Sequence, residues 1–139
     1  MSNIPASKRK ETKIDFFDRA IDLRKKIVEY IVFDFSDNDY VKHKIRDDIY
    51  RAMQDCIYCL TQANTIYITN LYEYNERRRY MTRAIGDCEY VIQEIQFAIR
   101  SNYAKASKYE NLIEDILKVE NSIKNWRKSD NGVRNKLKG

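Results

Sequence analysis

Apolar residues recur every three or four positions through most of this 139-residue chain, and polar residues fill the positions between them. That spacing places the apolar side chains on one face of a helix, because an α-helix completes a turn in about 3.6 residues. The pattern predicts four amphipathic helices, over about 12–35, 41–63, 70–101 and from Ser107 to about Ser129. The chain is therefore expected to be an all-α protein with one core.

Polar segments separate the predicted helices. Residues 36–39 end the first helix, because short polar side chains compete for backbone hydrogen bonds. The segment 64–71 is rich in β-branched residues, which lower helix propensity, so it fits either a loop or a continuing helix. Thr69 or Asn70 fits the N-cap position of the third helix. Ser107-Lys108-Tyr109-Glu110 matches a capping box at the start of the fourth.

Short connections between long helices predict an antiparallel up-down-up-down four-helix bundle over residues 12–131. Residues 1–11 contain the only proline and several basic residues, and we interpret them as a flexible basic arm. Residues 132–139, which open at Gly132, are expected to form a basic C-terminal tail.

Composition narrows the fold classes further. The chain has 3 glycines and 1 proline, too few for turn-rich β-sandwiches or for glycine-rich phosphate loops. Charged residues make up 34% and hydrophobic residues 43%, which is typical of amphipathic helices rather than of disorder. No apolar run approaches the roughly 20 residues that span a bilayer, and no secretory signal precedes Pro5. We therefore expect a soluble, cytoplasmic protein without membrane contact.

Charge is unevenly distributed along the chain. The net charge is +5; residues 1–13 carry +3, residues 124–139 carry +5, and the intervening residues 14–123 carry −3. Basic ends are typical of contact with nucleic acid, but they also keep a protein in solution. Composition alone leaves both interpretations open.

Residues that could carry catalysis or bind metal are few. A di-iron bundle needs two Glu-x-x-His pairs, and the chain has a single histidine, His43, so this class of site is excluded. The sequence also shows no nucleophilic triad that uses His43 as its base. Cys56 and Cys59 form C-x-x-C inside a predicted helix, and Cys88 is placed to lie opposite. Free cysteine is common in cores, so we interpret all three as structural, with a metal or redox site as the alternative. The sequence predicts no enzymatic activity, no metal and no cofactor.

The first half of the third predicted helix is crowded with arginine: Arg77, Arg78, Arg79 and Arg83. Successive helical residues point about 100° apart, so the three consecutive arginines do not share a face, whereas Arg79 and Arg83 do. Guanidinium groups bind phosphate through two parallel hydrogen bonds, which favours nucleic-acid binding. The alternative is ion pairing with acidic residues such as Glu76 or with those of neighbouring helices.

Aromatic and aliphatic residues also occur outside the main apolar faces. The chain has 11 tyrosines, many of them between Tyr67 and Tyr90. Tyrosine packs at subunit interfaces and also stacks on unpaired bases, and we expect packing to be the role of most of them. The apolar residues expected to be buried between subunits include Phe16, Ile57, Ile68 and Tyr90.

Two stretches resemble a known family. One is similar to the middle of the accessory variability determinant (Avd) proteins of diversity-generating retroelements: Ala63-Asn64-Thr65-Ile66-Tyr67 through Asn70-Leu71-Tyr72-Glu73-Tyr74-Asn75-Glu76-Arg77-Arg78. The other is similar to the tryptophan-bearing C-terminal helix of that family: Ile123-Lys124-Asn125-Trp126-Arg127-Lys128-Ser129-Asp130-Asn131. The resemblance covers about residues 10–131. The same fold family includes proteins encoded in intervening sequences of large-subunit ribosomal RNA.

The resemblance implies a ring-like homopentamer of four-helix subunits without catalytic activity. Such proteins bind the retroelement reverse transcriptase and its structured template RNA, and they support mutagenic cDNA synthesis and retrohoming. The implied partners are further copies of the chain, a reverse transcriptase, and structured RNA or an RNA–DNA hybrid. The residues assigned to phosphate contacts are Arg77, Arg78, Arg79, Arg83, Lys124, Arg127 and Lys128, with Lys8, Arg9 and Lys10 on the arm.

Two other functions fit the same sequence. A stand-alone helical RNA-binding protein of the ribosomal intervening-sequence type would present a similar charged surface. A structural helical adaptor would bind no nucleic acid. The body of this chain is net acidic, whereas the family is typically basic throughout; five copies would still carry about +25, with both ends of the chain contributing.

Overall fold

The computed structural model describes residues 13–36 and 38–137, which form four helices and no strand. The helices are α1 (Lys13–Asp34), α2 (Tyr40–Thr65), α3 (Leu71–Arg100) and α4 (Ala106–Arg134). The all-α class and the four helices predicted from the apolar spacing are confirmed. The predicted basic arm, with Lys8, Arg9 and Lys10, lies outside the described residues.

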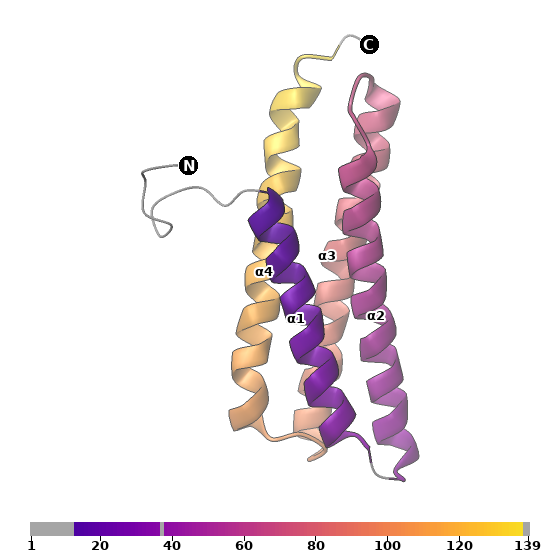
Figure 1. The fold of residues 1–139 in the computed structure, drawn as a ribbon, viewed down its shortest axis with the longest axis vertical. Helices are drawn as coiled ribbons and strands as arrows, with labels where there is room; N and C mark the ends of the chain where they lie inside the picture. The colour runs from indigo at the N-terminus through magenta and orange to yellow at the C-terminus, as the bar shows by residue number, and fades with distance from the viewer. Residues whose placement is uncertain (1–12, 37, 138–139) are drawn as a thin grey trace.

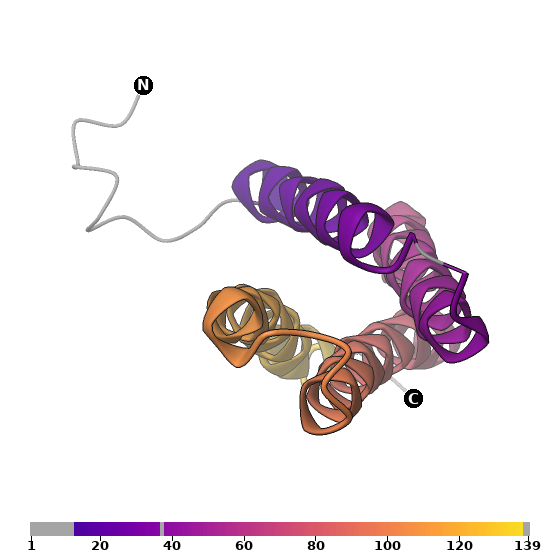
Figure 2. The same ribbon diagram turned by 90° about the horizontal axis from the view of Figure 1, so that it is seen from below.

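The helices pack in ring order around one core. Both α1 and α3 contact α2 and α4, and Figure 2 shows this order along the helix axes. The α1–α2 and α3–α4 connections lie at one end of the molecule, and the α2–α3 connection lies at the other (Figure 1). At that second end, α2, α3 and α4 extend beyond the first described turn of α1. None of the helices in the described ranges is long and apolar enough to cross a membrane.

The core is built from the apolar face of each helix. Burying an aliphatic or aromatic side chain of this kind contributes about 1.5–3 kcal/mol. The three cysteines are free and buried, as expected of core residues. The largest fully buried side chains are Phe35, Ile27, Ile31, Ile49, Met53, Leu60, Met81, Ile95, Tyr109, Leu112, Ile116 and Ile123.

Phe16 does not serve the subunit contact predicted for it. It is only 6% exposed and packs edge-on against Phe17 and Trp126, with ring centroids 5.6 and 6.2 Å away. Adjacent residues of a helix point in different directions, so the apolar spacing predicts that only one of the two phenylalanines, Phe17, faces the core. The approach of Trp126 from α4 provides contacts for both.

The ambiguous segment between the second and third helices is a short connection. Helix α2 continues to Thr65, and α3 begins after its N-cap residue Asn70, whose side chain accepts a hydrogen bond of 2.9 Å from the Glu73 backbone N–H. Glu73 in turn accepts a hydrogen bond of 3.0 Å from the Thr69 N–H. These reciprocal bonds satisfy donors that the first turn of a helix leaves unpaired.

The predicted capping box at the fourth helix is wrong. Helix α4 begins at Ala106, its N-cap is Lys105, and no side-chain hydrogen bond caps it. The reason lies in the end of α3, where Asn102 adopts a positive φ of 62°. The Tyr103 N–H then bonds to the Ala98 carbonyl at 2.8 Å, which closes the helix and turns the chain into α4 before Ser107.

Helix α4 also ends later than predicted. It continues past Ser129 to Arg134 and includes Gly132, which the sequence pattern assigns to the tail. The contacts of Asp130 and Asn131 with α3, described below, hold these last turns in place.

Alanine substitution at the two helix starts should affect the free energy of unfolding to different extents. Asn70→Ala removes a side-chain cap and should lower the free energy of unfolding by about 1 kcal/mol. Ser107→Ala removes no capping bond and should change it by about 0.5 kcal/mol or less. Urea unfolding followed by circular dichroism measures both. Equal losses of stability in the two variants would contradict the observed start of α4.

Candidate nucleic-acid interface

Trp126 lies at the centre of a polar contact between α3 and α4. The Arg77 guanidinium carbon is 4.8 Å from the centre of the indole ring, a cation–π distance. Arg77 Nε is also 3.1 Å from Asp130 Oδ2, and the two side chains are only 11% and 6% exposed. Burial lowers the pKa of Arg77, and the charge of Asp130 opposes this shift. Arg77 therefore connects α3 to α4 and has little surface left for a phosphate.

Arg78 joins the same pair of helices closer to the solvent. Its guanidinium donates to the Tyr74 hydroxyl at 3.2 Å and to the Asn131 side-chain oxygen at 3.4 Å. The Tyr74 hydroxyl donates to that same oxygen at 3.1 Å. Tyr74 is buried, whereas Arg78 is half-exposed. Arg78 is thus held at the surface of the α3–α4 contact, where a phosphate can reach it.

The two remaining arginines of the cluster face away from this contact. Arg79 is 75% exposed and forms an ion pair with Glu76 on the same helix at 3.0 Å. Arg83 binds both carboxylate oxygens of Asp55 on α2, with Nε 2.9 Å from Oδ2. The exposed Arg79–Glu76 pair contributes at most about 1 kcal/mol and does not prevent exchange for a phosphate, whereas the two-point contact of Arg83 with Asp55 holds that guanidinium more firmly.

The basic residues of α4 flank the contact. Arg127 donates to the Thr82 hydroxyl on α3 at 3.2 Å. Lys124 forms an ion pair with Glu120 at 3.0 Å, and its side chain is 44% exposed. Lys128 is exposed. Arg78 and Arg127 therefore lie along the α3–α4 contact, separate from Arg83 at the α2–α3 contact, and exposed Lys128 follows Arg127 on α4.

Charge differs between the two ends of the molecule. The end with the α2–α3 connection comprises residues 64–80 and 124–137, and we call it the basic end. It carries eight basic and three acidic residues. The opposite end, residues 30–48 and 97–115, carries six basic and eight acidic residues. A field of this sign attracts phosphate to the basic end.

A second polar cluster, which the sequence did not predict, lies between α2 and α3. Ligand atoms of Asp55, Cys59 and Asp87 lie within 4.8 Å of one another. Burial, then the hydrogen bond and charge of Asp55, raise the pKa of Asp87 to about 8. Burial acts against ionisation of Asp55 as well, but the hydrogen bond from Asp87 and the Arg83 guanidinium lower its pKa overall. The two carboxyl groups therefore share one proton at neutral pH.

The cysteines divide between this cluster and the core. The Cys56 and Cys88 sulfur atoms are 3.8 Å apart, while the Cys59 thiol lies 3.6 Å from Asp55. Burial raises the pKa of Cys59 to about 12, so its thiol stays protonated. The C-x-x-C pair thus does not converge on one site, and Arg83 already occupies both oxygens of Asp55. The expectation that the chain holds no metal stays a prediction.

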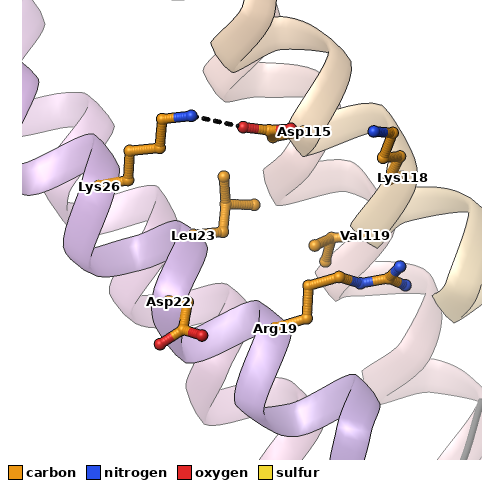
Figure 3. A pocket seen from close by; sticks show the side chains of 7 residues that line it. All are labelled: Arg19, Asp22, Leu23, Lys26, Asp115, Lys118 and Val119. Carbon is orange, nitrogen blue, oxygen red and sulfur yellow. Dashed lines mark hydrogen bonds and ion pairs between the residues drawn. The ribbon is translucent and has the colours of Figure 1, made fainter. Parts of the chain in front are cut away.

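A surface pocket of about 220 Å³ lies between α1 and α4 (Figure 3). Leu23 and Val119 form its apolar part, and Lys26 closes it through an ion pair of 2.8 Å with Asp115. Arg19 crosses the same gap to donate to Ser122. These contacts attach α1 to α4, and the seven lining residues contain no nucleophile beside a base.

Comparisons of the chain with protein-family models, with curated proteins and with solved structures found no match.

The buried and exposed arginines should respond differently to substitution. Arg77→Gln leaves the Asp130 carboxylate buried without its charged partner and should destabilise the protein by about 3 kcal/mol or more. Arg79→Gln removes an exposed pair and should cost about 0.5 kcal/mol or less. Thermal and urea unfolding of both variants test this. Similar stability of the two would show that Arg77 is not a structural residue.

The shared proton predicts a pH dependence of stability. Asp87 ionises near pH 4 in the unfolded chain and near pH 8 in the folded protein. Between these values the folded state binds more protons, so the free energy of unfolding falls as the pH rises. Asp87→Asn carries a neutral amide in place of the acid and should flatten this decline.

Asp47→Asn provides the matched control for that measurement, since the Asp47 side chain on α2 is 58% exposed. Its melting temperature should follow the parent protein from about pH 4 to about pH 8. If the stability of Asp87→Asn declined with rising pH as steeply as that of the parent protein, the result would contradict the shared proton.

Proposed function

We propose that this protein is an Avd-like accessory subunit of a diversity-generating retroelement. In this proposal it is a cytoplasmic, non-catalytic protein that binds the retroelement reverse transcriptase and its structured template RNA. It thereby supports mutagenic cDNA synthesis and retrohoming. RNA contacts the basic end through Arg78, Arg127 and Lys128, and the exposed Arg79, Arg83 and Lys124 add phosphate contacts at the sides.

The observation that carries the proposal is the contact between the two stretches that resemble the family. They are more than 40 residues apart in sequence, yet Arg77 stacks on Trp126 and pairs with Asp130, and Tyr74 bonds to Asn131. The resemblance therefore rests on one structural unit instead of two unrelated segments.

The same unit is surrounded by cations. The basic end has a net excess of positive charge: Arg79 is held by an exposed ion pair and Arg127 by one hydrogen bond to Thr82, while Lys124 pairs with Glu120, whose side chain is only 2% exposed. Phosphate contact through such residues binds RNA without reading its sequence. This suits a protein whose expected partner is a structured RNA.

The proposed assembly is a ring of five subunits, each an antiparallel up-down-up-down bundle. Connections at alternate ends of successive helices support the antiparallel order (Figure 1). Surface available for subunit contacts includes Ile21, Val32, Tyr58 and Tyr90, which are 44–52% exposed. Light scattering should give a mass of about 84 kDa, five times 16.7 kDa. A monomer at micromolar concentration would refute the ring.

RNA binding is tested by neutralising the α4 cations. The variant Lys124→Gln/Arg127→Gln/Lys128→Gln should weaken binding to a structured RNA and reduce the salt slope of affinity by about one for each phosphate that the variant no longer neutralises. Fluorescence anisotropy with a labelled RNA hairpin over a series of salt concentrations provides the measurement. Circular dichroism confirms that the variant is folded.

The matched control removes the same charge from the opposite end. Lys44, Arg100 and Lys105 are exposed, and their replacement by glutamine should leave the salt slope unchanged. Equal effects of the two triple variants would show that location does not matter and would contradict the proposed interface.

The alternatives predict different outcomes. A structural adaptor would bind no RNA even at moderate salt. A stand-alone RNA-binding protein of the ribosomal intervening-sequence type would bind RNA but would not be encoded beside a reverse transcriptase. A reverse-transcriptase gene and an adenine-mismatched repeat next to this gene would favour the retroelement function.

A further inference from the structure

Two tyrosines project from the basic end into solvent. Tyr67, in the α2–α3 connection, is 82% exposed, and Tyr72, in the first turn of α3, is 73% exposed. Neither ring contacts another ring or forms a hydrogen bond with the residues that the structure describes. Other tyrosines have such partners: Tyr109 packs against Tyr30, and Tyr58 packs against Tyr80. The faces of the two rings are therefore available to a ligand.

The backbone under both rings is anchored. Ile66 and Ile68 are half-buried on either side of Tyr67, and the Ile66 N–H bonds to the Ala63 carbonyl at 3.3 Å. This alternation directs Tyr67 outward. Tyr72 follows the Asn70 cap by two residues, so the first turn of α3 fixes its position. Tyrosine has few rotatable bonds, so a ring on a fixed backbone is a pre-organised contact surface.

Tyr67 lies beside the C-terminal turns of α4, whereas Tyr72 lies on the face of α3 that carries Arg79, seven residues further along the helix. A surface pocket of about 480 Å³ is lined by Tyr67, Ile66 and Ile68 from the connection, by Arg77 from α3 and by Val133 from α4. Exposed Arg134 and Lys136 follow Val133 in the chain. Aromatic faces next to fixed positive charge are the combination that holds unpaired nucleotides, because bases stack while the backbone meets cations.

We propose that Tyr67 and Tyr72 form a stacking platform for unpaired bases of the bound RNA, Tyr67 beside the cations of α4 and Tyr72 beside Arg79 of α3. This inference rests on the proposed RNA-binding function and specifies the part of the RNA that is bound: a loop, bulge or single-stranded end next to a paired segment. A protein partner fits this end less well, because its excess charge is positive and an RNA supplies the matching negative charge.

The test uses two RNA probes that differ only in unpaired bases. One is a hairpin whose loop carries a fluorescent adenine analogue that stacking quenches, and the other is a fully paired duplex with the same number of phosphates. The parent protein should bind the hairpin more tightly and quench its fluorescence. Tyr67→Ala/Tyr72→Ala should weaken hairpin binding by about fivefold or more per tyrosine and abolish the quenching.

Three further measurements distinguish base stacking on the tyrosines from electrostatic binding of the phosphates. Duplex binding and the salt slope should not change in Tyr67→Ala/Tyr72→Ala, since tyrosine carries no charge. Tyr67→Phe/Tyr72→Phe should retain hairpin affinity, because the ring face is kept. Tyr40→Ala is the matched control: Tyr40 is 81% exposed but lies at the opposite, net acidic end, and its replacement should have no effect.

Each other result overturns the inference in a recognisable way. If both probes bind and Tyr67→Ala/Tyr72→Ala binds them as the parent does, the platform is refuted while the RNA-binding function stands. If the substitution changes the mass of the assembly instead, the tyrosines form a contact between copies of the chain. If neither probe binds the parent protein, the proposed function fails and the platform fails with it.

Discussion

The buried ion pair between Arg77 and Asp130 is the contact on which the arrangement of the basic end depends. Removing a carboxylate from water is costly unless a cation lies against it, and Asp130 is only 6% exposed beside the Arg77 guanidinium. Trp126 covers that guanidinium from one side and also contacts the rings of Phe16 and Phe17 from α1. One tryptophan therefore brings three helices together at this end, and α4 must extend beyond Ser129 to supply the carboxylate.

Because of this contact, three arginines that are adjacent in sequence have different surroundings. Arg77 is enclosed, Arg78 is held at the surface by Tyr74 and Asn131, and Arg79 is exposed. Because each successive residue is turned by about 100° around α3, the three side chains meet three different surroundings. Ion pairing with a neighbouring helix, one of the two interpretations of the cluster, thus applies to Arg77, whereas Arg78 and Arg79 remain accessible to solvent.

Helix α3 carries polar contacts on both of its sides. The Arg77–Asp130 pair joins it to α4, whereas Asp87 and Arg83 join it to Asp55 on α2. The first contact is a pair of opposite charges. The second contains two carboxyl groups that share a proton, so its strength varies with pH and changes under mildly alkaline conditions.

The sequence by itself determined the helices, because apolar spacing and N-cap chemistry are local. It located all four helices to within a few residues except at the C-terminal end of α4, and it located Asn70 as one of two possible caps. It also placed the cysteines in the core. A signal for Asp130 was present as well, since this carboxylate follows Trp126 by four residues on the apolar face of α4.

Only the tertiary structure decided which polar residues meet. Asp130 pairs with a residue 53 positions away, and Asp55 with residues about 30 positions away, so no local pattern encodes these partners. The capping box at Ser107 failed for a local reason: the turn at Asn102, closed by the hydrogen bond from Tyr103 to Ala98 at the end of α3, sets where α4 begins. Long-range contacts determine which charged side chains are buried and which stay exposed. Burial against another helix changes the free energy of a charge far more than its neighbours in sequence do.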